Sequence, residues 1–216
     1  MATLGDIEDM PMNQLGLWSS VSLFVVGVLY AITVSVGIYT TGFTKPIVDP
    51  ILAVMEILTL ISSPLLVILV GAIHSTTPSE LKGYSSAAFA FMILTAGLTS
   101  SVHFIGLTAL RQTGIEGIIW PSVLYAAELL AWDIFLGLSL IFMAPLFQGA
   151  GLKRKIRSML ILTGTFCIIG SVGPFSGDMR FQFISVLGYG VLLPFVWFMM
   201  ARNFQCACSD ISENFS

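Results

Sequence analysis

Charged residues are scarce in this chain. Of its 216 residues, only 10% are charged and 56% are hydrophobic, whereas ordinary soluble domains carry about 25% charged residues. A soluble fold of this size could not hide so much apolar surface, so lipid must be the solvent for most of the chain. The nine lysines and arginines form no broad basic face, which argues against a nucleic-acid partner. We therefore expect the lipid bilayer as a partner and no nucleic acid.

Cysteine is also rare, and the familiar motifs of catalysis and nucleotide binding are missing. The three cysteines, Cys167, Cys206 and Cys208, make no disulfide framework. No G-x-x-x-x-G-K, G-x-S-x-G or G-x-G-x-x-G sequence occurs, which removes the commonest nucleotide and hydrolase signatures. No H-x-x-x-H, H-E-x-x-H or C-x-x-C spacing occurs either, which disfavours metal binding. The sequence therefore predicts no cofactor and no metal.

Long apolar runs are the dominant feature of what remains. Six of them are each close to the roughly 20 residues that a helix needs to cross a bilayer. Short polar segments separate them, so neighbouring helices should be antiparallel and adjacent. We predict an all-α protein of one membrane domain, with short polar tails and six transmembrane helices at about 17–39, 51–73, 85–108, 121–146, 156–174 and 182–201.

The distribution of basic residues predicts the orientation. Cytoplasmic loops of membrane proteins carry an excess of Lys and Arg. With six spans, one side collects six of the nine basic residues and the other side three. We therefore expect both termini in the cytoplasm. The first group is Lys82, Lys153, Arg154, Lys155, Arg157 and Arg202, and the second is Lys45, Arg111 and Arg180.

Ionisable side chains inside the predicted spans are the best clue to function. A charge in hydrocarbon costs a few kcal/mol, so a chain that keeps one usually uses it or pairs it. Counted along each helix at 1.5 Å per residue, Glu56, His103 and Glu128 lie roughly 8–12 Å from the same outer boundary. We expect at least two of the three to approach within about 6 Å, the range at which charges influence each other.

Asp133 lies deeper than these three, about 20 Å along the fourth helix from Trp120 and near the midplane. Arg157, the second residue of the fifth predicted span, is the one lysine or arginine within the predicted spans. It lies at the membrane boundary, so an ionic partner is not expected at the midplane. The sequence predicts hydrogen bonds from hydroxyl groups instead. The candidate partners are Ser62, Ser63, Thr95 and Ser139.

Polar residues recur on one face of the second and third predicted helices. Glu56, Thr59 and Ser63 are spaced by three or four residues, as are Thr95, Thr99 and His103. Residues at that spacing share a helical face. A lipid-facing helix would have no reason to keep such a stripe, so both faces should look inward.

Three stretches resemble a family of uncharacterised prokaryotic integral membrane proteins of about this length. They are NQLGLWSS at 13–20, VILVGAIH at 67–74 and FMAPLFQGAGLKRKIR at 142–157. The resemblance covers roughly residues 13–203 and implies six helices and a prokaryotic inner membrane. In that family an aromatic and an acidic residue recur in the fourth helix, here at Tyr125 and at Glu128 or Asp133. No established activity comes with the resemblance.

Three functions remain open from the sequence. The first is a binding or transport component for a small molecule, a lipid or protons, with Glu56, His103, Glu128 and Asp133 as its polar groups. The second is an intramembrane enzyme that uses His103 and a carboxylate as acid and base on a lipid or isoprenoid. The third is a structural subunit whose polar residues only hold helices together. Transport is favoured narrowly, because enzymes usually show a stronger local motif.

Overall fold

A computed structural model describes residues 4–42, 46–114 and 120–213 of the chain. The described residues form helices and turns and no strand. Six helical spans are long and apolar enough to cross a membrane, which confirms the predicted number and makes this a membrane protein of the helical-bundle class. The spans are Pro11–Thr41, Ile51–Ser75, Ser79–Leu110, Val123–Leu146, Leu152–Ser176 and Met179–Ser209.

Only the first two spans are single helices, α1 (Leu4–Thr41) and α2 (Ile51–Ser75). The third consists of η1 (Ser79–Leu81), α3 (Lys82–Ile105) and η2 (Gly106–Leu110). The fourth consists of α4 (Val123–Leu129), η3 (Leu130–Phe135), α5 (Leu136–Met143) and η4 (Ala144–Leu146). The fifth consists of α6 (Leu152–Gly170) and α7 (Val172–Ser176), and the sixth of η5 (Met179–Phe181), α8 (Gln182–Val186), η6 (Leu187–Leu192) and α9 (Leu193–Glu213).

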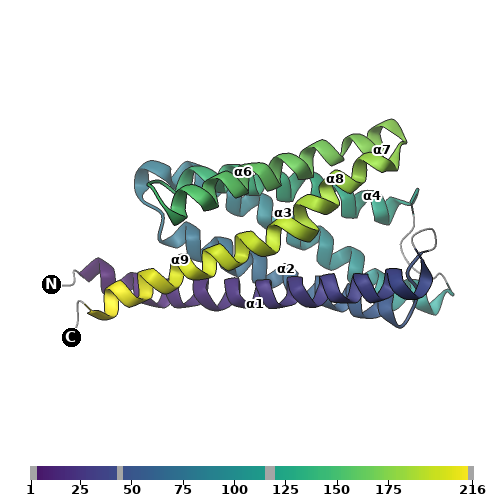
Figure 1. Ribbon diagram of the computed structural model, residues 1–216, viewed down its shortest axis with the longest axis horizontal. Coiled ribbons are helices and arrows are strands. Elements are labelled where there is room, and N and C mark those ends of the chain that lie inside the picture. Colours follow the sequence, from purple (N-terminus) through teal and green to yellow (C-terminus); the bar gives the residue numbers. More distant parts are fainter. Residues whose placement is uncertain (1–3, 43–45, 115–119, 214–216) are drawn as a thin grey trace.

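The bundle is arranged as two groups of helices (Figure 1). Helix α1 packs on α2 and α9, and α3 packs on α2 and α5. Helix α6 packs on α5, α8 and η6 on the side away from α1. The start of α1 and the end of α9 lie at one end of the bundle, as an even number of spans requires, and the end of α1 lies at the other.

Small residues allow a close helix contact between α5 and α6. A Cβ atom added at Gly164 would lie 2.7 Å from the carbonyl oxygen of Gly137, and one added at Gly137 would lie 2.9 Å from the carbonyl oxygen of Gly164. Helices in lipid associate through packing and hydrogen bonds, and glycine lets their backbones approach. The fourth and fifth spans are therefore held together at backbone distance, which fixes the fourth span's inward face.

Three π-helical segments interrupt the spans: η2, η3 and η6. Such segments account for well under 1% of residues in ordinary proteins, and they occur frequently at functional sites. Each one widens a helical turn and changes the direction of the side chains that follow. The segment η2 immediately precedes Arg111, η3 contains Trp132 and Asp133, and η6 contains Tyr189.

The helices extend beyond the predicted spans at several ends. Helix α9 continues to Glu213, through the segment predicted as a polar tail, so that Cys206 and Cys208 are both helical. Both are free cysteines, and Cys206 is exposed. The polarity of this segment marks where the helix leaves the apolar region and does not mark where the helix ends.

Candidate functional site

A cavity of about 660 Å³ lies inside the bundle. Its wall is built from α1, α2, α4, η6 and α9, together with residues 46–48 after α1 and single residues of α3 and η3. Most of the lining is apolar, including Leu23, Leu66 and Leu193. The polar and ionisable lining residues are Tyr30, Glu56, Thr59, Ser62, His103, Tyr125, Glu128 and Tyr189.

The structure brings His103 and Glu128 together at this cavity. The distance from His103 Nε2 to Glu128 Oε1 is 2.9 Å, across the interface between α3 and α4. Both side chains are mostly buried, with 13% and 19% of their surface exposed. This meets the expectation that two of the three outer ionisable groups approach within about 6 Å.

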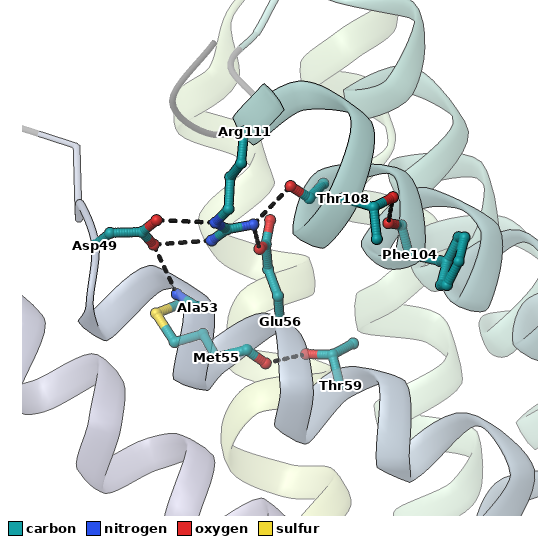
Figure 2. A network of polar contacts seen from close by, with 9 residues as sticks. Asp49, Ala53, Met55, Glu56, Thr59, Phe104, Thr108 and Arg111 are labelled. Carbon is teal, nitrogen blue, oxygen red and sulfur yellow. Dashed lines mark hydrogen bonds and ion pairs between the residues drawn. The ribbon is translucent and has the colours of Figure 1, made fainter. Parts of the chain in front are cut away.

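Glu56 lines the same cavity, but its ion-pair partner is Arg111 (Figure 2). Arg111 Nη1 donates to Glu56 Oε2 at 2.6 Å, and Nε and Nη2 donate to the two oxygens of Asp49 at 2.8 Å each. Glu56 is only 2% exposed. One guanidinium therefore bridges a buried carboxylate on α2 and a partly exposed one at the start of the same helix. We name Asp49, Glu56 and Arg111 the outer ion network.

The position of Arg111 depends on the π-helical segment before it. Arg111 Nη1 also donates to the carbonyl oxygen of Gly106 at 2.6 Å, five residues back, at the start of η2. Asp49 is held in turn by the backbone N–H of Ala53, which donates to Asp49 Oδ1 at 3.0 Å. Hydrogen bonds with Arg111 hold the pKa of Asp49 below its ordinary value, and those with Asp49 raise the pKa of Arg111. Asp49 and Arg111 are thus ionised near neutral pH.

Asp133 is fully buried, and its partner differs from the prediction. Gln182 Nε2 on α8 donates to Asp133 Oδ1 at 3.0 Å. The four predicted hydroxyl partners were wrong, because each of these hydroxyl groups donates to a backbone carbonyl oxygen. Ser139 donates to the carbonyl oxygen of Ala88. Ser62, Ser63 and Thr95 likewise donate to backbone carbonyls.

Several buried polar atoms of the third, fourth and sixth spans have no hydrogen-bond partner among the described residues. They include Glu128 Oε2, His103 Nδ1 and Thr99 Oγ1. The same is true of three further atoms, which also lack a hydrogen-bond partner: Asp133 Oδ2, Gln182 Oε1 and Trp132 Nε1. Such groups are uncommon in native proteins and call for an explanation, such as a bound molecule or water. Their concentration at the fourth span distinguishes it from the outer ion network.

The supporting residues of the prediction have different positions. Thr59 lines the cavity and donates to the carbonyl oxygen of Met55 at 2.9 Å, and Ser63 is buried behind it. Thr95 and Thr99 are buried on α3, where Thr95 also donates to the carbonyl oxygen of Ala131 at 3.4 Å. Tyr125 lines the cavity from α4. The inward orientation predicted for both polar stripes is therefore confirmed.

Sequence reasoning missed Arg111, Gln182 and the aromatic lining of the cavity. Arg111 follows the third apolar run and was predicted to lie in a loop. In the structure it pairs with two carboxylates, those of Asp49 and Glu56. Gln182 was the first residue of the sixth predicted span. Tyr30, Trp132 and Tyr189 carry no signal of their own, since aromatic residues are common in membrane helices. Only the fold brings them to one cavity.

No group of three or more His, Cys, Asp and Glu side chains in the described part of the chain is placed to hold a metal ion. No protein-family model, curated protein or solved structure matches the chain. The site itself must therefore carry any functional argument.

Proposed function

We propose that this membrane protein is a binding or transport component for an amphipathic small molecule or lipid. The observation that supports the proposal is the cavity of about 660 Å³, with apolar walls and an ionisable pair, His103 and Glu128, at the wall. Sites for small molecules are typically cavities of about 300–1,000 Å³ with mostly apolar lining and a few placed polar groups. The apolar wall would take the body of the ligand, and the polar pair its head group.

Proton coupling is compatible with the same groups. Ionisable residues inside membrane spans often mark proton relays in transporters. Two pairs provide positions for such a relay: His103 with Glu128, and the buried Asp133 with Gln182. Both carboxylates belong to the fourth span. Ligand binding near Glu128 and protonation would then compete for one carboxylate.

The proposal includes a location. A prokaryotic inner membrane, with both termini in the cytoplasm, follows from the resemblance and from the six-to-three distribution of basic residues. The outer ion network would then face the outside. A reporter that is active only in the cytoplasm should give signal when fused to the C-terminus and none when fused after Gly42. Reversed signals would overturn this orientation.

Binding can be tested on the purified protein in lipid nanodiscs. Trp132 and Trp197 line the cavity, so a panel of amphipathic compounds should change tryptophan fluorescence saturably. In Gly190→Phe the added ring starts at the cavity wall, where a Cβ atom would meet only Val186 Cγ1 at 3.8 Å. The saturable change should then disappear.

Gly97→Phe is the matched control, because Gly97 lies outside the cavity lining and a Cβ atom there meets nothing within 4 Å. It should bind like the parent. The proposal is contradicted if no compound gives a saturable change, or if Gly190→Phe binds as the parent does.

A second candidate is an intramembrane enzyme, which the distance of 2.9 Å between His103 and Glu128 favours. A carboxylate that orients an imidazole is a common arrangement for general acid–base catalysis. Mass spectrometry of lipid extracts incubated with the parent and with His103→Gln distinguishes the two. A product that only the parent forms supports the enzyme.

A further inference from the structure

The ionisable lining of the cavity is acidic. Glu56 and Glu128 line it, together with His103, and no lysine or arginine is among the lining residues in the described part of the chain. Glu56 is already paired with Arg111. Glu128 is the carboxylate whose charge is not met by a neighbouring guanidinium or ammonium group within the described residues.

Aromatic side chains from three different spans line the cavity together with Glu128. They include Tyr30 on α1 and Tyr125 on α4. Tyr189 on η6 is the third, and its ring centroid lies 5.3 Å from that of Trp132. All of these rings line the cavity. Aromatic faces attract cations, most strongly where water is excluded.

The two atoms of the His103–Glu128 pair that lack a hydrogen-bond partner are both acceptors when Glu128 is ionised. When Glu128 is ionised, His103 Nε2–H donates to its Oε1, and a neutral imidazole then presents Nδ1 as an acceptor. Glu128 Oε2 and His103 Nδ1 both lack a donor among the described residues. A ligand with several N–H donors and a positive charge would supply hydrogen bonds to these two acceptors and neutralise the Glu128 carboxylate. An anionic ligand would be repelled by that carboxylate.

We propose that the ligand of this cavity is an organic amine: an ammonium head group bound between Glu128 and the rings of Tyr30, Tyr125 and Tyr189, with an apolar body along α2 and α9. This inference rests on the proposed binding function and specifies its ligand class. Charge-assisted hydrogen bonds to the carboxylate and attraction to the ring faces act on the head group together. Burial of the apolar body supplies the remaining affinity.

The test uses three probes with one rigid body: adamantan-1-amine, adamantan-1-ol and adamantane-1-carboxylate. Their heads are cationic, neutral and anionic at pH 7. Binding to the purified protein in nanodiscs is measured by calorimetry, with Gly190→Phe as the filled-cavity variant. The amine should bind the parent at least about tenfold more tightly than the alcohol, the carboxylate should bind most weakly, and Gly190→Phe should bind none of them.

Glu128→Gln keeps the size of the side chain and removes its charge. It should weaken amine binding by about tenfold and leave alcohol binding within about twofold. Equal binding of amine and alcohol, or tighter binding of the carboxylate, overturns the amine assignment while the binding function stands. If no probe binds, or if Gly190→Phe binds like the parent, both proposals fail. The comparison of the three probes on the parent stands even if Glu128→Gln does not fold.

Discussion

The outer ion network and the carboxylates of the fourth span differ in whether a guanidinium group pairs with the carboxylates. In the outer ion network one guanidinium donates to both Asp49 oxygens and to Glu56. At the fourth span, Glu128 and Asp133 each have one oxygen bonded and one without a partner among the described residues. A carboxylate that is paired with a guanidinium group stabilises a fold, whereas a buried carboxylate oxygen without a partner costs stability and is typical of a binding site.

The comparison predicts its largest effect at Arg111. Replacing it by methionine leaves the buried charge of Glu56 without its partner, and breaking a buried pair in this way costs about 3–5 kcal/mol. We expect a large fall in the melting temperature of Arg111→Met, measured by thermal unfolding in detergent. The exposed pair of Arg180 and Asp178 is the control, because Arg180 is 87% exposed and such pairs contribute about 0–1 kcal/mol.

The double variant Arg111→Met with Glu56→Leu sharpens this prediction. It removes both charges and restores an apolar contact, so it should melt well above Arg111→Met alone. If Arg111→Met melts like Arg180→Met, the outer network is not what holds this end of the bundle, and the contrast between the two regions is lost.

Hydropathy predicted the spans because it is a local property of the chain, and length alone decides whether a helix can cross lipid. The partners inside the spans are not local. The pairing of Arg111 with Glu56 depends on the π-helical turn of η2 and on the packing of α2 against it. Gln182 reaches Asp133 because α6 packs against both α8 and η3. The spacing of residues in the sequence does not single out either contact, Arg111 with Glu56 or Gln182 with Asp133, from the other pairings that are possible.

Asp133 provides the next largest effect. Asp133→Leu leaves buried Gln182 with an amide that no longer has a partner, which costs about 1–3 kcal/mol. Asp133→Asn keeps the shape and an acceptor oxygen for Gln182 Nε2, so it should melt close to the parent. The melting temperatures of the two variants, measured side by side, check this. Equal losses in Leu and Asn variants would show that the charge of Asp133, and not its hydrogen bond, stabilises the fold.

Glu128→Gln should have a smaller effect on stability, in the opposite direction to that of Arg111→Met. The amide oxygen still accepts from His103 Nε2, while the charge with an unpartnered oxygen is gone. We expect a change between zero and about 1 kcal/mol of stabilisation, or up to about 2–4 °C in melting temperature. A loss as large as that of Arg111→Met would instead place Glu128 among the structural charges.

The smallest effect is the pH dependence of the outer ion network, which follows from Asp49. Its pKa is lowered in the folded protein, chiefly by hydrogen bonds from Arg111, so the folded state favours the ionised carboxylate more than the unfolded state does. That contribution is fully present above the unfolded pKa of about 3.9 and is lost as pH falls through the lower folded pKa. Asp49 is 42% exposed, so solvent screening keeps the contribution small. The melting temperatures of the parent and Asp49→Asn, measured from pH 7 to pH 3, should therefore differ by a constant amount above about pH 5 and converge below about pH 4. A difference that persists unchanged to pH 3 would mean that the Asp49 side chain acts through packing and not through its charge.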